Sequence, residues 1–77
     1  MFNIFKPDNK YDAKRQKANK DIVKLINQYI DKYPEQRFIQ ILWNLGIIQQ
    51  NKDGEILDRY CEEPWITLMR IGGNNEE

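Results

Sequence analysis

The apolar residues of this chain recur at helical spacing in three segments. The first runs from residue 11 to 33, contains neither Gly nor Pro, and places one set of residues on a common side: Ala18, Ile22, Leu25, Ile26, Tyr29 and Tyr33. This pattern predicts the longest helix of the molecule. Arg15 and Asn19 share its apolar side near the start, so close packing is expected to begin only near Ala18.

A second, shorter helix is indicated over residues 34–45. Pro34 disfavours the α conformation in the residue before it and suits the first turn of a following helix, while Gly46 supplies a left-handed stop. The expected buried stripe is Phe38, Ile41, Leu42 and Leu45, widened by Ile39 and Trp43. Because its start and stop signals are so clear, we expect the other elements to pack around this helix.

Polar residues at i, i+4 spacing form a ridge on the same segment: Gln36, Arg37, Gln40 and Asn44. Such a ridge usually faces water. Arg37 or Asn44 would alternatively hold the following loop by bonding its backbone, or the ridge would bind a partner.

Residues 47–57 indicate either a short β-hairpin closed around Asp53 and Gly54 or an irregular loop. In both cases we expect Leu57 and Tyr60 to return to the core.

A third helix is predicted to begin at Pro64 and to stop at Gly72. Glu62 and Glu63 precede it, where carboxylates suit the positive end of the helix dipole. Its apolar residues are Trp65, Leu68, Met69 and Ile71.

These elements predict a mainly α, compact three-helix domain with a long first helix. The 77 residues suffice for one domain, with 1–9 and 72–77 as flexible ends. Within the first of these ends, Phe2, Ile4 and Phe5 either cover an edge of the core or act as a sticky tag for a partner. The opening apolar run spans about five residues, too few for a signal peptide or a membrane span, and Cys61 has no second cysteine to pair with. A cytoplasmic location is therefore expected.

Charge is unevenly distributed although the net charge is zero. Seven basic residues stand against three acidic ones up to residue 24, whereas two basic residues stand against seven acidic ones from residue 53 onward. On the first helix Lys10, Lys14, Lys17 and Lys24 form a basic stripe, with Asp21 among them, which we expect on the side opposite the apolar residues. A solvated face and a nucleic-acid or acidic-partner surface are the two interpretations.

Residues able to perform catalysis are scarce. The chain contains no histidine and no serine, which removes the commonest general base and the Ser/His and Cys/His nucleophile pairs. Cys61 is expected to be a half-buried apolar side chain rather than a reactive thiol. A calcium loop would take Asn51, Asp53, Glu55 and Glu62 as ligands, but its sixth position would be Ile56 where glycine is required. We therefore expect no catalytic, cofactor or metal site and no enzymatic activity.

Two stretches together resemble a family of small uncharacterised bacterial and phage proteins. They are QRFIQILWNLG over residues 36–46 and DRYCEEPWITL over residues 58–68. In that family a Q-R-x-x-Q-x-L-x-N-L helix precedes an aromatic and acidic segment that opens a short helix. The resemblance covers roughly residues 34–71, implies a compact, mostly helical fold and brings no known activity. The chain departs from the pattern at Cys61 and in carrying a long basic helix in front.

Three functions are compatible with the sequence. The first is a protein-interaction module with an unknown partner, which the uneven charge and an aromatic content of 12% suggest. If the chain comes from a phage, it would be for example an inhibitor of a host protein. The second is a nucleic-acid-associated protein that uses the basic stripe, and the third is a self-associating structural protein. The candidate interaction residues are Lys10, Lys14, Lys17, Lys24, Arg37, Trp43 and Trp65.

Overall fold

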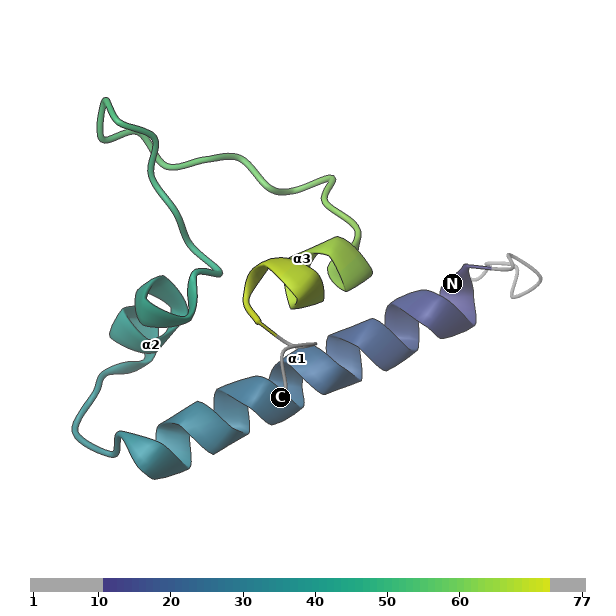
Figure 1. Cartoon of the computed structure of the whole chain (residues 1–77), viewed down its shortest axis with the longest axis horizontal. Coiled ribbons are helices and arrows are strands. Elements are labelled where there is room, and N and C mark those ends of the chain that lie inside the picture. The colour runs from purple at the N-terminus through teal and green to yellow at the C-terminus, as the bar shows by residue number, and fades with distance from the viewer. Residues whose placement is uncertain (1–10, 73–77) are drawn as a thin grey trace, which may run out of the picture.

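The computed structural model describes residues 11–72 and contains three helices, which confirms the mainly α, three-helix prediction. Helix α1 spans Asp12–Lys32, α2 spans Phe38–Leu45 and α3 spans Pro64–Arg70. Figure 1 shows α1 as a long rod, with α3 beside its first half and α2 beside its end. The predictions for residues 1–9 and 73–77, including the role of Phe2, Ile4 and Phe5, lie outside the described residues.

Helix α1 is the element around which the others are arranged. Both α2 and α3 pack against it, and α2 and α3 make no close backbone approach to each other. The expectation that the second helix forms the centre is therefore wrong. The physical reason is length: α1 has 21 residues and α2 has 8, so only α1 offers room for two neighbours along its side.

Helix α2 begins four residues later than Pro34, which corrects the predicted start. After α1 ends, the chain makes a turn in which the Gln36 amide donates to the Tyr33 carbonyl (3.1 Å). Arg37 is extended, and its amide donates to Oε1 of Gln40 at 2.9 Å, so a side chain from the first turn satisfies a backbone donor at the helix start. At the other end Gly46 adopts φ 89°, as its sequence position predicts.

Residues 47–57 form a tight turn with one antiparallel bridge, between Gln50 and Ile56, rather than a two-stranded hairpin. Asn51 organises the tip, since its Oδ1 accepts from the amides of Asp53 (2.8 Å) and Glu55 (3.0 Å). The segment leaves α2, projects away from the helices and crosses back to α3 (Figure 1).

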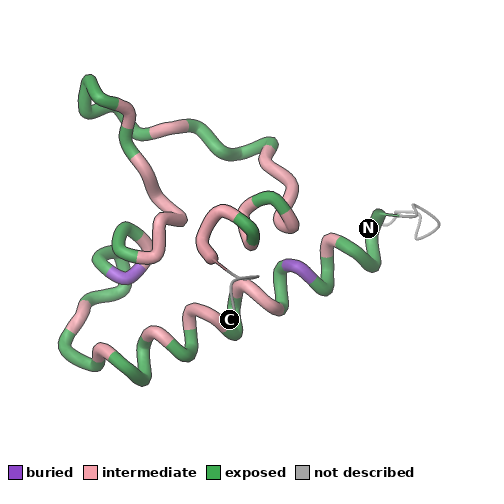
Figure 2. The backbone as a smooth tube through the Cα atoms, in the orientation of Figure 1, coloured by how far each residue is buried: buried purple, intermediate pink, exposed green. Residues whose placement is uncertain are grey.

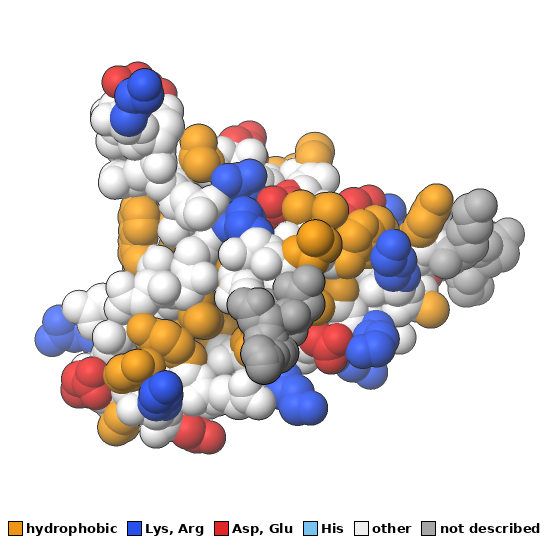
Figure 3. Space-filling model, in the orientation of Figure 1, with side chains coloured by type: hydrophobic (Ala, Val, Ile, Leu, Met, Phe, Trp, Pro, Cys, Tyr) orange, Lys and Arg blue, Asp and Glu red, His pale blue; other side chains and the backbone are white. Residues whose placement is uncertain are grey.

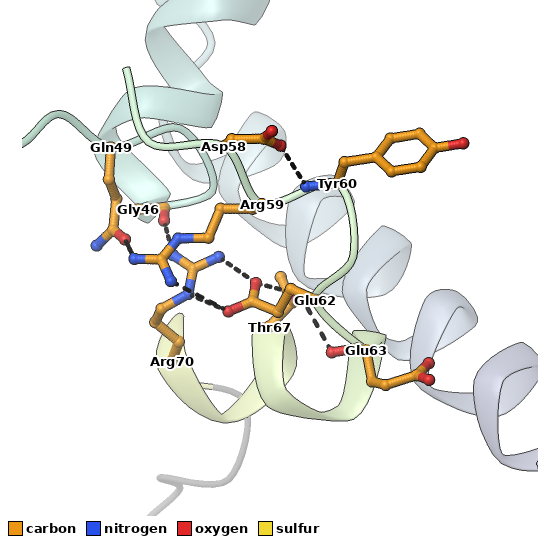
Figure 4. Close-up of polar contacts among 9 residues, drawn as sticks. All are labelled: Gly46, Gln49, Asp58, Arg59, Tyr60, Glu62, Glu63, Thr67 and Arg70. Atoms are coloured by element: carbon orange, nitrogen blue, oxygen red, sulfur yellow. Dashed lines mark hydrogen bonds and ion pairs between the residues drawn. The ribbon is translucent and has the colours of Figure 1, made fainter. Parts of the chain in front are cut away.

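Burial is sparse in the described part of the chain. Ala18 and Ile41 are its two buried apolar residues, and most of the remaining backbone is half-buried or exposed (Figure 2). Three residues expected in the core, Phe38, Tyr60 and Met69, are exposed instead, Tyr60 to 92%. The amide of Tyr60 donates to the Asp58 carboxylate at 2.9 Å, and the ring points away from the helices (Figure 4). Helical periodicity marks an apolar side, but the neighbours available in this fold cover only part of it.

No helix within residues 11–72 is long and apolar enough to cross a membrane.

Candidate interaction surfaces

A polar cluster joins the long connection to both ends of α3 (Figure 4). At its centre is Glu62, whose side chain is 10% exposed. Arg70 donates to this carboxylate through Nη2 at 2.7 Å and Nε at 3.2 Å, and the Thr67 hydroxyl donates at 2.7 Å. Hydrogen bonding from Arg70 lowers the pKa of Glu62 against an opposing effect of burial. The cluster therefore holds a charged carboxylate inside the fold.

The same arginine ties α3 to the end of α2. Its Nη1 donates to the carbonyl of Gly46, the residue that terminates α2. Arg59 adds a second link, because its Nη2 donates to Oε1 of Gln49 at 2.6 Å and its Nη1 lies 3.5 Å from Glu62. Polar side chains thus connect α3 to the end of α2 and to the segment that follows it.

Glu63 points in the opposite direction and pairs with α1. Arg15 donates to its two carboxylate oxygens from Nε (2.8 Å) and Nη2 (2.9 Å), a two-pronged contact between the start of α1 and the start of α3. This bonding lowers the pKa of Glu63 and raises that of Arg15. Neither carboxylate caps α3 by a side-chain hydrogen bond, although both precede the helix as the sequence predicts.

An apolar groove lies between α1 and α3, which we call the α1–α3 groove. Ala13, Ala18, Trp65 and Leu68 line it, and three charged side chains of α1 stand along its edge: Lys14, Lys17 and Asp21. Its volume is about 430 Å³. The Lys14 ammonium lies 4.1 Å from the centre of the Trp65 ring, and the Tyr11 ring is 5.9 Å from it.

Lys14 and Lys17 therefore border the apolar side of α1 instead of lying opposite to it, which corrects the prediction for these two residues of the stripe. At about 100° per residue, Lys14 lies about 40° and Lys17 about 100° around the helix from Ala18. Lys17 pairs with Asp21 at 2.9 Å, and Lys24 is exposed. Lys10 lies outside the described residues.

The polar ridge of α2 forms a second depression, with a volume of about 600 Å³. Arg37, Trp43 and Asn44 line it together with Gln36 and Gln40. The side-chain amide of Asn44 donates to Oε1 of Gln36 at 2.8 Å. The ridge therefore holds the turn that precedes α2 and not the loop that follows it. Of the candidate residues, the structure thus brings Lys14, Lys17 and Trp65 together at one place, and Arg37 and Trp43 at another.

Large apolar side chains of α2 and α3 are also exposed. Phe38 and Ile39 lie at the start of α2, with Trp43 one turn further along, and Ile66 and Met69 lie on α3. On the face shown in Figure 3, apolar side chains gather over α2 with the adjacent end of α1, and over α3. Sequence periodicity assigned Ile39 and Trp43 to the edge of a buried stripe, and the exposure of their side chains could not be read from it.

No group of three or more cysteine or carboxylate side chains within residues 11–72 is arranged to hold a metal ion. Asn51 uses its side chain to organise the 47–57 turn, and Glu62, the proposed last ligand of a calcium loop, pairs with Arg70. Cys61 is exposed rather than half-buried, because the chain between Asp58 and Glu62 turns at the surface.

Comparison with family models, with curated proteins and with solved structures finds no match for this chain.

Proposed function

We propose that the chain is a non-enzymatic protein-interaction module that binds its partner through apolar side chains exposed on its short helices. The observation that carries the proposal is the exposure of Phe38 and Ile39 beside Trp43 on α2, in a described chain with two buried apolar residues. Contiguous exposed apolar side chains with an aromatic residue at their centre are typical of protein-binding surfaces.

The contacts of the lysines favour a protein over a nucleic acid. Lys14 lies over the Trp65 ring, and Asp21 interrupts the basic stripe and pairs with Lys17, so the described part of the stripe is not a continuous row of cations along which a phosphate backbone binds. If the chain comes from a phage, inhibition of a host protein is a form that this function would take.

The experiment is capture of binding proteins by the tagged full chain, compared between two charge substitutions. Ile39→Glu places a carboxylate in the first turn of α2, where the helix dipole tolerates it, so the fold is expected to persist. Val23→Glu is the matched control, since Val23 on α1 is exposed to 55% and Ile39 to 56%.

Proteins that bind the wild type and the Val23→Glu variant, and are lost from the Ile39→Glu variant, are the expected result. Equal capture by all three chains would exclude the α2 surface. Sedimentation of the chain alone tests the alternative function, self-association. That alternative requires a mass above that of the monomer at high protein concentration.

A further inference from the structure

The α1–α3 groove combines an apolar floor with a basic edge. Ala18 and Leu68 are aliphatic, and the Trp65 ring closes one side. The volume of about 430 Å³ lies in the range of pockets that take small ligands, which is space for a few side chains and not for a folded domain. An occupant must therefore present projecting apolar side chains.

The edge of the groove selects the charge of the occupant. Lys14 and Lys17 are spaced i, i+3 along α1, and the Lys17 side chain is 78% exposed. Over its whole length α1 carries six basic and three acidic residues. Asp21 offsets part of the charge of Lys17 locally, so the excess at the edge is positive but moderate.

We propose that the α1–α3 groove binds an acidic amphipathic helix of a partner protein. Apolar side chains of that helix enter the groove between Trp65 and Leu68, and its carboxylates meet Lys14 and Lys17. Residues three or four apart on a helix are about 5–6 Å apart, so acids at i, i+3 or i, i+4 of the partner match the spacing of the two lysines. This is the groove mode of helix recognition, and it rests on the proposed protein-binding function while naming the chemistry of the partner.

A nucleic acid fits the groove less well. Base stacking needs a free aromatic face, and the ammonium of Lys14 already lies over the Trp65 ring. A nucleic-acid backbone also offers no side chains for the aliphatic floor formed by Ala18 and Leu68, whereas an amphipathic peptide does.

The experiment is selection of displayed random peptides on the full chain. A length of about 15 residues is suitable, because shorter helices are marginal in water. Tryptophan-free versions of the selected peptides are then titrated into the Trp43→Phe chain, in which Trp65 is the remaining fluorophore. We expect the selected peptides to carry acids beside apolar residues at helical spacing and to shift the Trp65 emission.

Three variants decide whether the groove is the site. Lys14→Glu combined with Lys17→Glu is expected to weaken binding about tenfold or more, since each substitution replaces an attraction with a repulsion. Ala13→Phe fills the groove and is expected to abolish binding without altering its charge. Lys52→Glu is the matched control on the exposed 47–57 turn and leaves binding unchanged. Circular dichroism checks that each variant is folded.

The proposal is overturned if selection yields no binder or if the selected peptides lack acidic residues. It is also overturned if these peptides bind the Lys14, Lys17 and Ala13 variants as tightly as the wild type, or if an oligonucleotide rather than a peptide shifts the Trp65 emission. Peptides that lose affinity in Ile39→Glu but not in the groove variants overturn the groove and leave the proposed function standing. Failure of both this selection and the capture experiment removes both.

Discussion

At the level of single residues, Glu62 holds the arginine that connects α3 to the end of α2. Its carboxylate accepts from Arg70 and Thr67 of α3, and Arg70 also reaches the Gly46 carbonyl at the end of α2. A carboxylate with 10% exposure is tolerated because these donors replace the water it has lost. Removing the charge leaves Arg70, itself 17% exposed, without its partner.

Glu62→Gln is therefore expected to lower the free energy of unfolding by about 2 kcal/mol, the usual range for hydrogen bonds to charged groups. Urea unfolding measures the change. Lys17→Ala serves as the control, because the Lys17–Asp21 pair is largely exposed and its loss should cost about 0.5 kcal/mol or less. Equal losses in the two variants would contradict the central position of Glu62.

Lowering the pH should remove the stability that the charged Glu62 carboxylate contributes. The folded pKa values of Glu62 and Glu63 are below the ordinary value of 4.5, so the unfolded chain binds more protons as the pH falls through that value. Stability supplied by the two carboxylates is present above about pH 4.5 and is lost as the pH falls through the lowered folded values.

The difference in unfolding free energy between wild type and Glu62→Gln should therefore be constant from neutral pH to about pH 5 and shrink at lower pH. Urea titrations at several pH values provide the measurement. A difference that grows as the pH falls would show that the carboxylate is not stabilised in its charged form.

At the level of elements, the proline and glycine positions in the sequence predicted the number of helices and some of their boundaries. Pro64 begins α3 and Gly46 ends α2, as their backbone preferences require. The start of α2 was missed because Pro34 fits a turn as well as a first helical position, and only the contact between Arg37 and Gln40 decides between them.

Gly46 provides a test at this scale. Its φ of 89° is unfavourable for residues with a Cβ, although a Cβ added there would meet nothing within 4 Å. Gly46→Ala is expected to cost about 1 kcal/mol through the backbone alone, and Gly46→Asn less, because asparagine tolerates the left-handed region. Thermal or urea unfolding checks the order, and an alanine variant as stable as the wild type would contradict the assigned backbone.

The 47–57 turn should behave as a separate local unit. Asn51→Ala removes the acceptor for the Asp53 and Glu55 amides, so hydrogen exchange at these two amides should accelerate. Global stability should change little, because the tip of the turn is exposed. Amide exchange followed by NMR distinguishes this from global unfolding, in which the amides of α1 would accelerate as well.

At the level of the whole molecule, the contacts that define the candidate surfaces are long-range and were not accessible from sequence patterns. Arg15 with Glu63, and Lys14 with Trp65, meet because α3 lies along the first half of α1. Periodicity places each residue on a face of its own helix but does not say which face of another helix it meets. For the same reason Phe38 was assigned to the core and Ile39 to its edge, although among the described helices α2 has only α1 as a neighbour.

The central claim is that α2 divides its apolar residues between a core side and a side left for a partner. The free energies of unfolding of Ile41→Ala and Ile39→Ala test this most directly, because the two substitutions are chemically identical and two positions apart on one helix. Ile41→Ala, at a buried position, should lower the free energy of unfolding by about 2–5 kcal/mol. Ile39→Ala, at a half-exposed position, should lower it by about 1 kcal/mol or less. Equal losses would mean that Ile39 belongs to the core, and the surface proposed for the partner would not exist.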